Sequence, residues 1–123
     1  MKLLQSTIVL LFTFTFSTYT NAQMNISSID APFHIGKSVV ACGLIKEIVP
    51  FKSGVYLNMD KHHPHQSLTL VVWDDDLNEF ENRHGELNKL INSRACASGR
   101  VKMYRGRSQI SLQNAYSFKS LVQ

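Results

Sequence analysis

The sequence predicts a small all-β domain, a five-stranded barrel with one helix between the third and fourth strands. Residues 55–60 and 68–73 both follow the period of two that is typical of strands with one buried face. From Asp76 the apolar spacing changes to that of a helix, and a period of two returns at Ala97. The 123 residues are enough for one domain with a hydrophobic core and too few for two.

Residues 1–22 read as a cleaved secretory signal peptide. Lys2 supplies a positive start, residues 3–16 form a mostly apolar run, and small or polar residues precede the end at Ala22. The alternative is a membrane anchor, but this run is shorter than the roughly 20 residues that a spanning helix needs. We therefore expect a periplasmic or secreted protein that has no contact with the membrane after cleavage.

The charge of the predicted mature chain is only mildly basic. Without Lys2, 12 Lys and Arg stand against 9 Asp and Glu, a formal charge of +3. Such a balance does not by itself indicate nucleic-acid binding, because net charge concerns solubility and non-specific attraction. The acidic residues are concentrated in residues 74–86, which separates them along the chain from most of the basic residues.

Cys42 and Cys96 are the only cysteines. In an oxidising compartment, two cysteines usually form a disulfide, and we predict one here. Both cysteines also fall on the outward register of strands that are expected to be neighbours. Two free thiols are the alternative, since a sequence does not show whether the Cα atoms are close enough to bridge.

The segments before the helix comprise a lead-in and three strands. Residues 23–35 are expected to be a loose lead-in with one short helical turn, because Pro32 interrupts anything longer. Residues 39–45 are rich in strand formers, and Gly43 among them indicates a bulge or bend. Strands over 55–60 and 68–73 follow, joined by a polar loop around Pro64. Six side chains are expected to point into the core: Val55, Leu57, Met59, Leu68, Leu70 and Val72.

Five apolar residues after Asp76 are spaced to form one helix face, interrupted by Gly85: Leu77, Phe80, Leu87, Leu90 and Ile91. Asp74, Asp75 and Asp76 stand where this helix begins. We interpret them as capping residues that also favour the positive end of the helix dipole, rather than as a metal site.

Two more strands follow, over 97–103 and 109–113, joined by a turn between Tyr104 and Ser108. Gly106 is expected to supply the backbone angles of this tight hairpin. The segments SVVACGLIKEI and RACASGRVKMY align with Gly43 opposite Gly99. Three strands, a helix and two strands is the layout of the five-stranded OB-fold Greek-key barrel.

Four motifs resemble the small bacterial OB-fold domains of the anticodon-binding-like, nucleic-acid-binding type. They are VACGLI, GVYLNMD, HPHQSLTLVVW and YRGRSQI. The resemblance covers roughly residues 36–117, where Leu68 replaces a common aromatic. It implies an OB-fold domain over residues 36–118 with a C-terminal tail at 119–123. It leaves the ligand open, because OB barrels bind nucleic acids, sugars, peptides and proteins.

The candidate site is the outward face of the second and third strands together with the hairpin that overhangs it. Aromatic side chains there would stack on bases, and arginines would contact phosphates, although charged hairpin tips also serve solubility alone. Trp73 alternatively packs under the helix. The candidate ligand-binding residues are Tyr56, Asn58, Thr69, Trp73, Lys102, Tyr104, Arg105, Arg107 and Gln109.

The sequence predicts a binding module rather than an enzyme. No spacing of Ser, His and Asp indicates a nucleophile and its base, and no cofactor motif is present. His62, His63 and His65 share one loop, which favours a solvated loop over a metal site. We expect an exported domain that contacts single-stranded DNA or RNA. The alternative is an envelope adaptor that binds a protein partner or small ligand.

Overall fold

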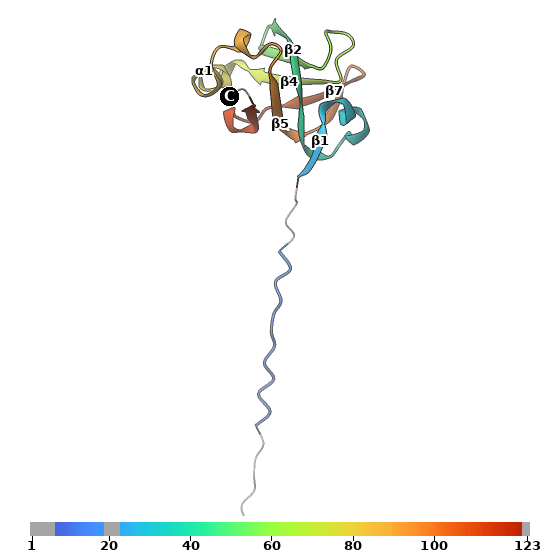
Figure 1. Cartoon of the computed structure of the whole chain (residues 1–123). Coiled ribbons are helices and arrows are strands. Elements are labelled where there is room, and N and C mark those ends of the chain that lie inside the picture. The colour runs from blue at the N-terminus through green and yellow to red at the C-terminus, as the bar shows by residue number, and fades with distance from the viewer. Residues whose placement is uncertain (1–6, 19–22, 122–123) are drawn as a thin grey trace, which may run out of the picture.

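The computed structural model describes residues 7–18 and 23–121. Residues 7–18 contain no helix or strand and run away from the folded part of the chain (Figure 1). The expected end of the signal peptide at Ala22 lies outside the described residues, so the cleavage site stays a prediction. Among the helices that the structure describes, none is long and apolar enough to cross a membrane.

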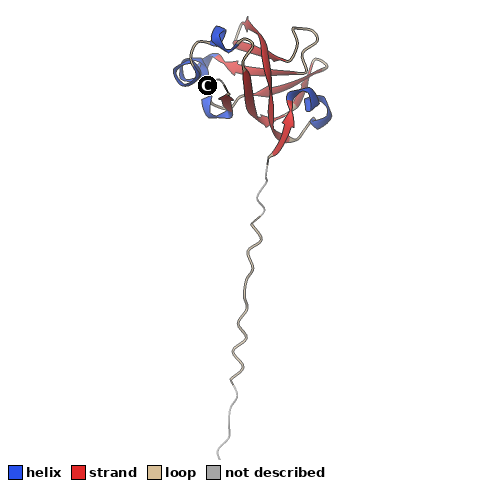
Figure 2. Cartoon of the chain, in the orientation of Figure 1, coloured by secondary structure: helices blue, strands red, loops and turns tan. Residues whose placement is uncertain are grey.

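The chain folds into a curled β-sheet with short helices at its margins (Figure 2). The hydrogen-bonded order is β6-β7-β4-β3-β2-β5-β8, and β1 pairs with β2 in parallel. The strands are β1 Met24–Ser27, β2 Ser38–Phe51, β3 Gly54–Met59, β4 Leu68–Trp73, β5 Arg94–Arg100, β6 Lys102–Tyr104, β7 Arg107–Ser111 and β8 Phe118–Ser120. The α-helix is α1 Asp74–His84, and the 3₁₀ helices are η1 Ser28–His34, η2 Leu87–Leu90 and η3 Ala115–Ser117.

The expected fourth strand is divided into β5 and β6. Only Val101 separates them, and β5 pairs with β2 while β6 pairs with β7. One segment of chain therefore forms β6 at one end of the strand order and β5, the neighbour of β8, near the other end. Because no strand pairing joins these ends within the described residues, the hydrogen-bonded path is open, and a closed five-stranded barrel is not confirmed.

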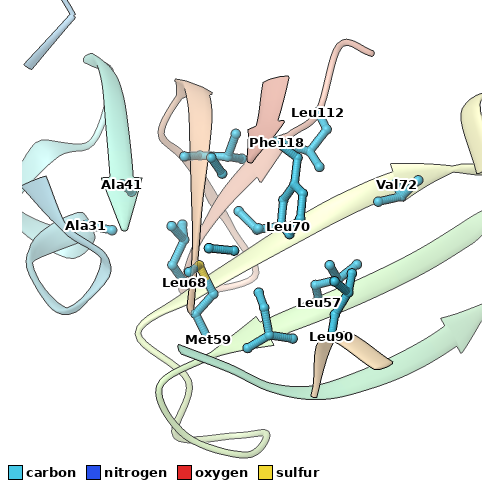
Figure 3. Close-up of a cluster of buried hydrophobic side chains, with 14 of the residues drawn as sticks. Ala31, Ala41, Leu57, Met59, Leu68, Leu70, Val72, Leu90, Leu112 and Phe118 are labelled. Atoms are coloured by element: carbon cyan, nitrogen blue, oxygen red, sulfur yellow. The ribbon is translucent and has the colours of Figure 1, made fainter. Parts of the chain in front are cut away.

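The core lies between the inward faces of the strands and the helices that cover their ends. All six side chains of β3 and β4 that were expected to point inward are buried. Figure 3 shows Leu57, Met59, Leu68 and Leu70 gathered with residues from other elements, including Phe118. Burying such a side chain contributes about 1.5–3 kcal/mol. The period-two reading of these two strands is confirmed.

The helical region agrees with the expected face in part. Phe80 and Leu90 are buried, but Ile91 is exposed, because α1 ends at His84 and Ile91 lies just beyond the end of η2 at Leu90. Gly85 closes the helix with φ of 85° while its N–H donates to the carbonyl of Glu81.

The three aspartates occupy the first turn of α1 rather than its N-cap. The N-cap is Trp73, and no side chain makes a capping hydrogen bond there. The capping interpretation is therefore wrong. The favourable position of three carboxylates near the positive end of the helix dipole stands.

Gly43 serves close packing, whereas the bulge lies elsewhere. An added Cβ at Gly43 would come within 1.8 Å of the Oγ of Ser28 and 2.7 Å of the Oδ1 of Asp60. Ser28 donates to Asp60 at 2.5 Å, and the N–H of Leu44 donates to the same carboxylate at 3.3 Å. The irregularity in strand pairing falls between Ile45 and Glu47 instead.

Two short strands flank the expected domain. β1 forms within residues 23–35, expected to be loose, and Pro32 lies inside η1. β8 pairs with β5 and includes two residues of the expected tail, 119–123, whose residues 122–123 are not described. The first half of β2 therefore lies between β1 and β5.

The predicted disulfide is confirmed. Cys42 and Cys96 face each other directly in the antiparallel β2–β5 pair, with Cα atoms 4.0 Å apart and an S–S distance of 2.02 Å. Both side chains point to the outside of the sheet, as the alternation around Ala41 and Ala97 requires.

Candidate ligand-binding site

A row of polar residues crosses five strands on the outward face of the sheet. The strand register places Glu47 of β2 opposite Asn58 of β3, Asn58 opposite Thr69 of β4, Thr69 opposite Gln109 of β7, and Gln109 opposite Lys102 of β6. The bulge beside Lys46 makes this possible, because it reverses the side-chain alternation of β2 and turns Glu47 outward.

A pocket of about 590 Å³ lies over this row. Seven of the nine predicted ligand-binding residues line it: Tyr56, Asn58, Thr69, Tyr104, Arg105, Arg107 and Gln109. Four lining residues were not predicted: Glu47, Val49, His63 and Gln66. The structure therefore brings most of the predicted set together at one hollow, and adds residues from β2 and from the loop before β4.

Trp73 and Lys102 do not line this pocket. Trp73 is 38% exposed, and its Nε1–H donates to the Oγ of Ser111 at 2.6 Å. Its ring meets the edge of Phe51 at 5.9 Å, and Phe51 stacks on Tyr56 at 4.1 Å. Trp73 thus ends an aromatic row that holds Tyr56 in place, and Lys102 is exposed at the far end of the polar row.

The floor of the pocket is a chain of hydrogen bonds. Asn58 donates to Glu47 at 2.8 Å, Thr69 donates to Asn58 at 2.7 Å, and Gln66 donates to Thr69 at 3.2 Å. These contacts explain why Asn58 and Thr69 are buried although they face outward. The Oε1 atom of Gln66 is buried without a hydrogen-bond partner, which leaves one acceptor at this floor unsatisfied.

Glu47 ties the loop between β3 and β4 to the pocket. Its carboxylate accepts hydrogen bonds from the backbone N–H of His63 at 2.5 Å and from the His62 ring at 3.2 Å. The bond from the His63 backbone holds the pKa of Glu47 below its usual value, against the opposing effect of desolvation. These bonds fasten the loop to β2, although His62, His63 and His65 stay exposed, as expected of a solvated loop.

The hairpin between β6 and β7 turns through Arg105 and Gly106. Both have positive φ angles, 49° and 76°, as the two central residues of a type I′ hairpin turn require. The Gly106 expectation is confirmed. The Arg105 guanidinium lies 5.4 Å from the centre of the Tyr104 ring, which is 48% exposed. The hairpin thus holds a cation and an aromatic ring together at the pocket.

The arginines of the pocket have no acidic partner. Among the described residues, the only ion pair joins His62 and Glu47. The pocket therefore has two arginines against the one carboxylate of Glu47, whose oxygens already accept hydrogen bonds from the protein. Such an arrangement suits an anionic ligand.

His62, His63 and His65 do not converge on a metal site in the described part of the chain. No group of three or more His, Cys, Asp or Glu residues there could hold a metal ion. His62 is bound to Glu47, and the His63 ring lies 3.2 Å from the side-chain nitrogen of Gln66.

No family model matches the chain, and no curated protein matches it. Solved structures do. The S. pombe Stn1-Ten1 complex contains a chain that is 19% identical, with a TM-score of 0.55, covering 75% of this chain and 68% of that one. OBody AM1L10, whose structure is bound to hen egg-white lysozyme, is 12% identical with a TM-score of 0.57, covering 87% and 100%.

A putative aspartyl-tRNA synthetase from Leishmania major is 11% identical, with a TM-score of 0.55. The match covers 87% of this chain but 22% of the synthetase. At these identities the similarity shows the fold alone. This chain has an OB fold, as its motifs predicted.

Proposed function

We propose that this chain is an exported, non-catalytic module that binds single-stranded nucleic acid in the pocket over β3, β4 and β7. The observation that carries the proposal is the pair Arg105 and Arg107, which are unpaired cations beside the aromatic rings of Tyr104 and Tyr56. Guanidinium groups bind phosphates, and exposed rings stack on bases.

Single strands fit this surface better than duplexes do. A base can reach the Tyr104 ring and the polar floor only when it is unstacked and unpaired, whereas a duplex offers mainly its phosphates to a concave site. The disulfide between Cys42 and Cys96 supports the proposed export, because structural disulfides persist in oxidising compartments.

The test is fluorescence anisotropy with a labelled 12-nucleotide deoxythymidine strand at several salt concentrations. The Arg105→Ala/Arg107→Ala variant should lower affinity and reduce the log–log salt slope by about 1.4, since each phosphate contact on a single strand contributes about 0.7. Tyr104→Ala should weaken binding by about 1–3 kcal/mol through lost stacking, with little change in slope.

The matched control removes the same charge elsewhere. Lys89→Ala/Arg94→Ala also loses two cations, both exposed and neither at this pocket. This control should keep the wild-type slope if the contacts are local. Equal slopes for the wild type and the Arg105/Arg107 variant would contradict the proposal.

A second candidate function is an adaptor that binds a protein partner on the same face. It is favoured by the similarity to an OBody whose structure is bound to lysozyme. An envelope partner would be captured without a steep salt dependence if its interface is apolar. Absence of binding to the strand at low salt, with the fold intact by circular dichroism, would support this candidate.

A further inference from the structure

A second hollow, separate from the first, lies where the end of α1 meets η3 and β8. It has a volume of about 620 Å³ and is lined by Arg83, His84, Tyr116, Phe118, Lys119 and Ser120. It shares no residue with the pocket at the hairpin. In Figure 1, α1 lies at the left of the folded part and β7 at the right, and β8 is at the opposite end of the strand order from β6.

The side chains of this hollow are held in place. The Arg83 guanidinium lies 4.0 Å from the centre of the Tyr116 ring. The His84 ring packs against Phe80 and Phe118 at 4.7 and 5.0 Å, and its Nε2–H donates to the carbonyl of Ala115 at 2.6 Å. Packing and this hydrogen bond fix His84, and a cation–π contact with Tyr116 holds the Arg83 guanidinium.

The hollow is positively charged and contains no acid. Arg83 and Lys119 line it, no Asp or Glu is among its lining residues, and neither cation is in an ion pair in the described part of the chain. The carbonyl end of α1 favours cations in its last turn, which accounts for Arg83 on the helix. It does not account for the stacking on Tyr116 or for Lys119, which comes from β8.

An arginine stacked on an exposed aromatic ring is suited to nucleotides. Tyr116 is 68% exposed, so part of its ring stays open to a base. The edges of the guanidinium and the Lys119 ammonium remain available to phosphate oxygens. The same pairing of cation and ring occurs at the hairpin, where Arg105 lies near Tyr104.

We infer that Arg83, Tyr116 and Lys119 form a second contact site for single-stranded nucleic acid, on a different part of the surface from the hairpin pocket. This inference rests on the proposed function. A chain with two such sites holds two short strands at once, or two parts of one long strand. The shared ligand chemistry is a base next to a phosphate.

The experiment is isothermal titration calorimetry of the folded, oxidised protein with a six-nucleotide deoxythymidine strand at low salt. The wild type should bind two strands per chain, whereas Arg83→Ala/Lys119→Ala and Arg105→Ala/Arg107→Ala should each bind one. Lys89→Ala/Arg94→Ala, which removes two charges outside both sites, should still bind two. Tyr116→Ala, which keeps both cations, should weaken the second site by at least about fivefold.

The results separate this inference from the proposed function. The second site is overturned, and the first left intact, if the wild-type chain binds one strand, the Arg105/Arg107 variant binds none and the Arg83/Lys119 variant still binds one. Two strands per chain in the Arg83/Lys119 variant also overturn the second site. The proposed function at the hairpin pocket is contradicted if the wild type binds no strand. It is also contradicted if the wild type binds one strand and only the Arg83/Lys119 variant loses it.

Discussion

Removal of the disulfide should cost about 4 kcal/mol of unfolding free energy. Cys42 and Cys96 are 54 residues apart in sequence, and the loop that they close contains β3, β4 and α1. For a loop of this length, the chain-entropy model gives about 14 cal/mol/K of lost denatured-state entropy, or about 4 kcal/mol at 25 °C. Both cysteines lie on the outside of the sheet, so their replacement by Ala leaves no core cavity.

The assay is urea unfolding of the wild type, the wild type with reductant, and Cys42→Ala/Cys96→Ala. With a urea m-value of about 2 kcal/mol/M, the midpoint should fall by about 2 M in the reduced protein and in the variant. Reductant should have no effect on the variant. A loss below about 1 kcal/mol would refute the reasoning, because it would mean that the bridge does not restrict the unfolded chain.

Two further predictions concern the elements that position the pocket. Gly43→Ala should lower the free energy of unfolding, measured in urea, by about 3 kcal/mol, because the new methyl group displaces the hydrogen bond from Ser28 to Asp60. A change within about 0.5 kcal/mol would contradict this packing. Glu47 has a lowered folded-state pKa, so its stabilising contribution is present above its usual pKa of 4.5 and is lost as pH falls through the folded value. Glu47→Gln should therefore lose less stability than the wild type between pH 6 and pH 3, and equal losses would show that the bond from His63 does not matter.

The sequence was sufficient to predict the elements whose pattern is regular. The period of two in β3 and β4 identified the buried and outward faces, and the outward face contains Tyr56, Asn58 and Thr69 of the pocket. The hairpin was predictable because Gly106 marks its turn. The disulfide was predictable because two strands that open in the same way were expected to be neighbours.

The pocket residues that the sequence did not predict are placed there by features that leave no local sequence pattern. Glu47 and Val49 face the pocket because of the bulge after Ile45, and one extra residue changes the face of everything beyond it. Gly43 suggested a bulge, but the structure requires a glycine there because Ser28, fifteen positions earlier in the sequence, approaches it closely. The periodicity of a single segment does not reveal tertiary contacts of this kind.

The loop residues His63 and Gln66 were missed for a related reason. Their composition indicates a polar loop, and only the three-dimensional contact with Glu47 brings them to the pocket. Trp73 was assigned to the ligand surface from its alternation. Its hydrogen bond to Ser111 and its contact with Phe51 place it beside the pocket instead.

The central claim is that single-stranded nucleic acid binds in the pocket over β3, β4 and β7, and backbone amide NMR tests it most directly. Titration of ¹⁵N-labelled protein with a 12-nucleotide deoxythymidine strand at low salt should shift the amides of Tyr56, Thr69, Arg107 and Gln109. The amide of Lys89, which lines neither hollow, should stay unchanged. Unchanged amides around the pocket at saturating strand concentration would contradict the account.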